Sequence, residues 1–269
     1  MSAGSSRTAD EPGGLTAAYR AVRVRIGAVL VLLVLAGAGW WWTAGQMTGM
    51  DGGPWSPLGS PGWFLVVWTV MMAAMMFPSV APTVALYARM TRTRQPLLPA
   101  AFTVGYLAVW FGAGALALAL AALADIIPGD VLAWDRWGRP LTIATLLLAA
   151  AYEFTPWKNA CLGRCRSPLG FLLGTWRDGW SGAGVMGARL GAWCLGCCGA
   201  LMAALFALGV MNLVWMGSVA ALIALEKLLP WRRTATTVTA AVLVGLAVLV
   251  IVAPNAIAGP AMTPTAPMG

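Results

Sequence analysis

The sequence predicts an all-α membrane protein, a polytopic bundle of about seven transmembrane helices. Three observations support this fold class. The 269 residues are 60% hydrophobic and only 10% charged, with a mean hydropathy of +0.79, which lies outside the range of soluble domains. Long apolar runs alternate with short segments that hold most of the charge. The 15 Trp and 32 Gly are typical of membrane proteins, where indoles lie at the interfaces and small residues let helices approach closely.

The chain is expected to begin with a tail and a membrane anchor. Residues 1–25 are predicted to form a disordered cytoplasmic tail, because the first 14 are mostly small and polar. A charge-free run over residues 26–42 follows, about one bilayer crossing long once its flanks are included. Basic residues before an apolar run also occur in signal peptides. The run ends in three Trp, however, which favours a retained anchor.

Six further spans are expected along the rest of the transmembrane domain, which covers residues 26–253. They comprise residues 63–88, about 99–124, about 141–152, about 189–210, about 213–229 and about 237–253. The fourth is short for a crossing and is expected to start earlier. Pro78 removes a backbone hydrogen bond from the second, which is expected to bend or open there. Residues 155–188 are expected to form a long loop, and residues 254–269 a flexible tail.

The distribution of basic residues predicts the orientation. With the N-terminus in the cytoplasm, 15 of the 17 Lys and Arg residues fall on the cytoplasmic side, and only Arg136 and Arg139 fall outside. This matches the positive-inside rule. The net charge of +8 therefore indicates contacts with membrane lipids and not a surface for nucleic acid.

The side chains available for chemistry are few. The sequence has no His, which excludes a His-ligated haem, a His general base and any zinc site that contains His. Its five Cys residues lie in two short stretches, around residues 161–165 and 194–198. A soft-ligand or thiol function must therefore depend on these cysteines, with Met as a further sulfur donor.

The two cysteine stretches are expected to face each other on the cytoplasmic side. If helical, Cys161 and Cys165 share a face, and so does Cys194 with either Cys197 or Cys198. A site made only of sulfur suits Cu(I), tetrahedral zinc or an iron–sulfur cluster. The reducing cytoplasm favours a metal over a structural disulfide. The alternative is that these cysteines pack as small buried hydrophobic residues.

A set of methionines extends the candidate copper ligands. Thioethers bind Cu(I) without losing a proton, so they suit a site inside the membrane. The candidates lie on the second and fifth predicted spans and in the turn after the fifth; they are Met71, Met72, Met75, Met76, Met202 and Met211. Met is also an adaptable packing residue, and this remains the alternative. Glu153, Glu226 and Lys227 lie near membrane ends, and Glu226 and Lys227 are expected either to form an interfacial pair or to be functional.

Several strings within residues 63–230 carry a resemblance to a known family. They are MMAAMMFP at residues 71–78 with Tyr87, TPWK and CLxxCRSP within residues 152–168, CxGCCxALM at residues 194–202, residues 209–216 and EKL at residues 226–228. The chain thus resembles bacterial predicted metal-binding integral membrane proteins, some of them described as membrane copper chaperones for copper oxidases such as polyphenol oxidase. Two positions depart from the family pattern: Gly199 replaces a usual Trp, and Arg164 stands where members often have His.

The residues and the resemblance together predict a binding protein and not an enzyme. The expected function is a Cu(I) chaperone or transfer protein in a bacterial inner membrane, with a copper-dependent oxidase or accessory protein as its client. Zinc is the second candidate metal. Two alternatives stay open: a membrane thiol–disulfide oxidoreductase, and a structural subunit whose cysteines hold zinc.

Overall fold

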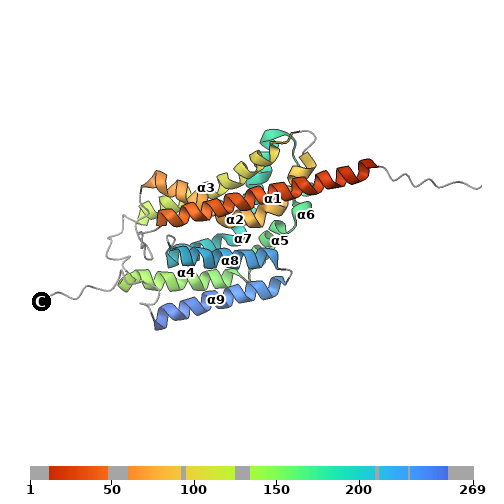
Figure 1. Ribbon diagram of the computed structural model, residues 1–269. Helices are drawn as coiled ribbons and strands as arrows, with labels where there is room; N and C mark the ends of the chain where they lie inside the picture. Colours follow the sequence, from red (N-terminus) through yellow and green to blue (C-terminus); the bar gives the residue numbers. More distant parts are fainter. Residues whose placement is uncertain are drawn as a thin grey trace, which may run out of the picture.

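The protein is a bundle of long helices packed side by side (Figure 1). The computed structural model describes residues 12–47, 60–91, 95–124, 134–209, 212–229 and 231–253, and within them every regular element is helical. The elements are α1 (Pro12–Met47), α2 (Pro61–Thr91), α3 (Leu98–Ala124), the π-helical turn η1 (Trp134–Gly138), α4 (Arg139–Tyr152), α5 (Pro156–Cys165), α6 (Pro168–Thr175), α7 (Gly179–Leu208), α8 (Leu213–Leu228) and α9 (Arg232–Val252). The predicted all-α class is confirmed for this part of the chain.

Five of the described helices are long and apolar enough to cross a membrane. They lie at Ile26–Gln46, Pro61–Thr91, Leu98–Leu123, Gly179–Leu208 and Arg233–Val252. Helices α4 and α8 have 14 and 16 residues and fall below that length, although η1 leads directly into α4, as expected for a span that starts early. Both pack against α7 and α9 inside the bundle. The chain is therefore a membrane protein, and a total of about seven spans stays a prediction.

Several helix boundaries differ from those expected. Helix α1 begins at Pro12 and so includes residues 12–25, which we expected to belong to a disordered tail; residues 1–11 lie outside the described part of the chain. This stretch holds three Ala and three Arg, which are strong helix formers. Helix α2 continues through Pro78 and Pro82 to Thr91, so it does not open there. Residues 254–269 also lie outside the described part.

The segment over residues 155–188 is helical and not a loop. Helix α5 begins with Thr155, whose side chain accepts a hydrogen bond from the backbone N–H of Lys158, followed by Pro156. Helix α6 likewise begins with Pro168 in its first turn. A capping hydroxyl and an N-terminal proline are standard helix-start signals. Helix α7 then starts at Gly179, ten residues earlier than the expected span.

Helices α3 and α7 touch along glycines. A Cβ on Gly105 of α3 would lie 2.1 Å from the backbone oxygen of Gly184, and a Cβ on Gly187 of α7 would lie 1.9 Å from the oxygen of Phe102. No residue larger than glycine fits without separating the helices. Close backbone contact of this kind is a common way for membrane helices to associate. It also places Tyr106 of α3 beside the cysteines of α7.

Candidate metal centre

Four cysteine sulfurs come together where α5 lies against α7. The Sγ atoms of Cys194, Cys197 and Cys198 all lie within 4.8 Å of one another. Cys197 Sγ is 3.3 Å from Cys198 Sγ and 3.8 Å from Cys165 Sγ of α5. The spacing of three and four residues places the α7 cysteines on one helix face, as the sequence predicted. All five cysteines are free thiols, and only Cys165 is not fully buried.

Helix α2 contributes a fifth sulfur. Met76 is completely buried, and its Sδ lies 3.8 Å from Cys194 Sγ. We call Met76, Cys165, Cys194, Cys197 and Cys198 the five-sulfur cluster. Its members come from three helices that are far apart in the sequence, so the cluster forms only when the bundle is assembled.

Cys161, which we expected to bind metal with Cys165, packs against α7 at Gly196, one residue before Cys197, and its role as a ligand stays a prediction. A Cβ on Gly196 of α7 would lie 2.7 Å from Cys161 Sγ, so this thiol packs directly on the backbone of α7. Burial raises the pKa of the Cys161 thiol. The absence of a side chain at Gly196 lets α5 approach α7. Tyr152, the last residue of α4, joins α4 to the same point of α7 by donating from its Oη to Gly196 O at 2.7 Å.

The α7 cysteines lie in the middle of their helix and not in its first turns. Cys194 is 15 residues after Gly179 and 14 before Leu208. The expected position at the cytoplasmic mouth rested on a span beginning near Arg189, whose side chain is exposed and does not end the helix. The cluster is therefore enclosed by the bundle.

The other predicted methionine ligands are core residues. Met71, Met72 and Met75 are buried on α2, and Met72 precedes Met76 by one turn on the same face. Met202 is buried on α7, one turn beyond Cys198. Met211 lies outside the described residues. A line of thioethers across the bilayer thus stays a prediction.

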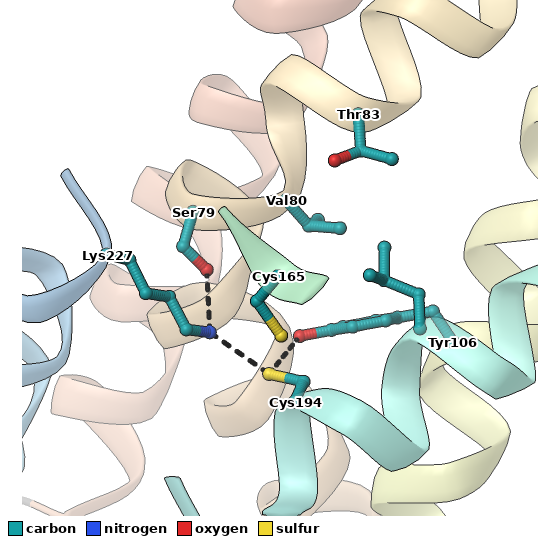
Figure 2. Close-up of a pocket in the computed structure, with 8 residues that line it drawn as sticks. Ser79, Val80, Thr83, Tyr106, Cys165, Cys194 and Lys227 are labelled. Carbon is teal, nitrogen blue, oxygen red and sulfur yellow. Dashed lines mark hydrogen bonds between the residues drawn. The ribbon is translucent and has the colours of Figure 1, made fainter. Parts of the chain in front are cut away.

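Lys227 of α8 points at the cluster. Its Nζ lies 3.1 Å from Cys194 Sγ and 3.3 Å from Ser79 Oγ (Figure 2). It also lies 3.7 Å from Met76 Sδ. Within the described residues, no carboxylate forms a salt bridge with it. The expected pair between Glu226 and Lys227 is therefore wrong. The two residues are consecutive on a helix, so their side chains point in different directions.

Tyr106 completes the polar contacts of Cys194. Its Oη lies 3.0 Å from Cys194 Sγ, and both groups are buried (Figure 2). Tyr106 and Lys227 line a small pocket that reaches Cys165 and Cys194. Sequence reasoning missed Tyr106, since an isolated tyrosine on an apolar helix gives no signal. Lys227 belongs to the family-like EKL string at residues 226–228, and this was a signal for its role that the alternative of a pair with Glu226 obscured.

A model of the PpoB2 copper chaperone family matches residues 65–250. The chain belongs to this family. The match runs from the first turns of α2 into α9 and so contains every residue of the five-sulfur cluster. The search of curated proteins and the search of solved structures found no match. Membership in the PpoB2 family and the buried cysteine triad of α7 both fit a copper-binding role.

A second buried polar group adjoins the centre of this PpoB2 family member. Lys158 of α5 forms salt bridges with Glu153, at the end of α4, and with Glu226 of α8, the latter at 2.8 Å. We call these three residues the carboxylate–lysine triad. Each is about 1% exposed, and Glu153 Oε1 has no hydrogen-bond partner. The triad ties α5 to the ends of α4 and α8.

Burial controls protonation in the triad. It raises the pKa of Glu153 to about 8, against the lowering effect of Lys158. Burial also lowers the pKa of Lys158, but the two carboxylates outweigh it and the net shift is upward. Burial thus favours the protonated form of Glu153, whereas the two acidic side chains around Lys158 favour its charged form.

Proposed function

We propose that the protein is a Cu(I) chaperone that binds copper on the five-sulfur cluster and passes it on for the metallation of a copper enzyme. The observation that carries this proposal is the convergence of four thiols and one thioether from three helices in a chain without His. Thiolate and thioether sulfur are the ligands that favour Cu(I). Membership in the PpoB2 copper chaperone family supports the same metal.

Transfer requires only that sulfur ligands exchange. A Cu(I) ion bound by two or three of the sulfurs can move to a neighbouring sulfur 3.3–3.8 Å away without entering water. Cys165 is the least buried thiol of the cluster and lines the pocket together with Cys194. It is therefore the group at which an incoming ion would first bind. No bond in a substrate is broken, so no catalytic residue is needed and the protein is not an enzyme.

We place the protein in a bacterial inner membrane with a cytoplasmic N-terminus and about seven spans, α4 and α8 included. The basic residues favour this orientation through the positive-inside rule, and they would contact lipid headgroups. The cluster would then receive copper from the cytoplasmic side. The client would be a copper-dependent oxidase or its accessory protein, as the resemblance to chaperones of copper oxidases implies.

Metal analysis of the full chain tests the proposal. Protein purified in detergent under reducing conditions should bind about one Cu(I) per chain, as the formation of one cluster implies. The double variant Cys194→Ser, Cys197→Ser should lose this copper. Cys161→Ser is the comparison variant, because Cys161 packs on the backbone of α7 at Gly196 and is not one of the five sulfurs of the cluster. Absence of copper, or equal copper in the double variant, would contradict the proposal.

A thiol–disulfide function is the second candidate. Cys165 Sγ and Cys197 Sγ are 3.8 Å apart on different helices, close enough for a small movement to form a disulfide. Thiol trapping in growing cells distinguishes the two functions. A chaperone should keep both thiols reduced throughout, whereas an oxidoreductase should show a fraction of molecules with this disulfide.

A further inference from the structure

We infer that Lys227 determines the metal specificity of the five-sulfur cluster, favouring monovalent copper over divalent zinc. The inference rests on the proposed function and names a residue that selects the metal. The observation behind it is the position of the Lys227 ammonium group, which lies 3.1 Å from Cys194 Sγ (Figure 2). The same group lies 3.7 Å from Met76 Sδ. A cation thus already contacts two of the five sulfurs.

Without Lys227 the cluster would be a good zinc site. Cys165, Cys194, Cys197 and Cys198 offer four thiols in contact, and four thiolates are the usual ligand set of structural zinc. A chaperone for Cu(I) therefore needs a feature that rejects zinc. The cysteines themselves do not provide it, because both metals accept thiolate.

Lys227 disfavours zinc whether or not the metal binds Cys194. A metal on Cys194 at the usual Zn–S distance would lie within about 5.4 Å of Lys227 Nζ. Coulomb's law makes the repulsion of a divalent ion at that position twice that of a monovalent one. A metal that avoids Cys194 keeps three thiols of the cluster, Cys165, Cys197 and Cys198. Three thiolates satisfy Cu(I) but leave zinc without its fourth protein ligand.

The described neighbours of Lys227 position its ammonium group without pairing it with a carboxylate. Ser79 Oγ of α2 lies 3.3 Å from Nζ, and in the described part of the chain no carboxylate forms a salt bridge with Lys227. The carboxylate of its neighbour Glu226 forms its salt bridge with Lys158 instead. Among the described residues no carboxylate therefore pairs with Lys227, and its positive charge acts on the sulfur cluster.

The test compares the affinities of the full chain for two metals. Reduced protein in detergent is titrated with Zn²⁺ and with Cu(I) in competition with chromophoric chelators. In Lys227→Gln, which removes the charge, the zinc dissociation constant should fall about tenfold or more, and that of Cu(I) should change less. Lys227→Arg is the control and should keep the wild-type preference. Lys227→Met supplies a second uncharged side chain of similar length.

The outcomes separate this inference from the proposed function. Unchanged zinc affinity in folded Lys227→Gln and Lys227→Met, or an equal gain for both metals, would overturn the role of Lys227. Folding is checked by thermal unfolding of each variant. Failure of the wild type to bind Cu(I) would contradict the proposed function, whereas a gain of zinc in the uncharged variants would still support selection by Lys227.

Discussion

Glu226 and Lys227 are consecutive residues whose side chains enter different sites. Glu226 joins the buried triad with Lys158, and Lys227 contacts the sulfurs of Cys194 and Met76. One turn of α8 therefore contributes a residue both to the carboxylate–lysine triad and to the candidate metal centre. A change at either residue should affect a different property, fold stability for Glu226 and metal preference for Lys227.

Glu153 gives the fold a predictable pH dependence. Its pKa is raised by burial from 4.5 to about 8, so the folded protein retains a proton that the unfolded chain loses at lower pH. The resulting stabilisation is complete below pH 4.5 and is lost as the pH rises toward 8. Glu153→Gln cannot ionise. The Tm of the wild type should therefore fall relative to this variant between pH 4.5 and 8, measured in the same detergent. A constant Tm difference would contradict the assignment.

At the scale of the elements, α5 is positioned by charge. Lys158 binds carboxylates at the ends of α4 and α8, and α5 carries Cys165 to within 3.8 Å of Cys197. The start signals of α5, Thr155 and Pro156, are visible in the sequence. The partners of Lys158 are not, because they lie five and 68 residues away and depend on how the helices meet.

Loss of Lys158 should release α5. In Lys158→Met two buried carboxylates lose their only shared cation, a change that typically costs about 3–5 kcal/mol. Mild oxidation should then form less of the Cys165–Cys197 disulfide than in the wild type, measured by mass spectrometry. Glu226→Gln added to Lys158→Met should recover part of the stability. An unchanged disulfide yield would show that α5 is held by other contacts.

The contact of α3 with α7 should be equally sensitive. Gly187→Ala places a Cβ 1.9 Å from Phe102 O and must separate the two helices, at a cost of about 1–3 kcal/mol or more. Gly199→Ala is the matched control on the same helix, since its Cβ would meet only Leu195 at 4.0 Å. Thermal unfolding of both variants checks this. Equal Tm values would contradict the importance of the glycine contact.

At the scale of the whole molecule, the sequence predicted the class of the fold better than its boundaries. Hydropathy identified every helix of membrane length, because a bilayer requires long apolar runs. It placed the start of α7 too late, since Gly179 and Arg189 look like loop residues although the helix runs through the segment between them. Because α7 begins ten residues earlier than expected, its cysteines lie in the middle of the helix and not at its end.

The sulfur donors were equally visible in the sequence, but their grouping was not. The spacing of Cys194, Cys197 and Cys198 predicted one face of α7. The choice of Cys165 over Cys161, and of Met76 among four clustered methionines, depends on the contact of α5 and α2 with α7. Contacts between helices distant in sequence leave no mark in residue spacing.

The number of spans is testable in cells. If α4 and α8 cross the membrane, topology reporters fused after residues 130 and 211 should be extracytoplasmic, and those after residues 166 and 231 should be cytoplasmic. This expectation assumes that the residues next to a short helix help it to reach across the membrane, as η1 extends α4 at its N-terminal end. If the reporters at residues 130 and 166 lie on the same side of the membrane, α4 does not cross it.

X-ray absorption at the copper edge tests the central claim most directly. The full chain, loaded with Cu(I) under reducing conditions, should show sulfur as the only ligand type, because every donor of the five-sulfur cluster is a thiol or a thioether. The Cys194→Ser, Cys197→Ser variant should lose this signal. A copper shell made mainly of oxygen or nitrogen, or the same sulfur signal in that variant, would contradict the proposed centre.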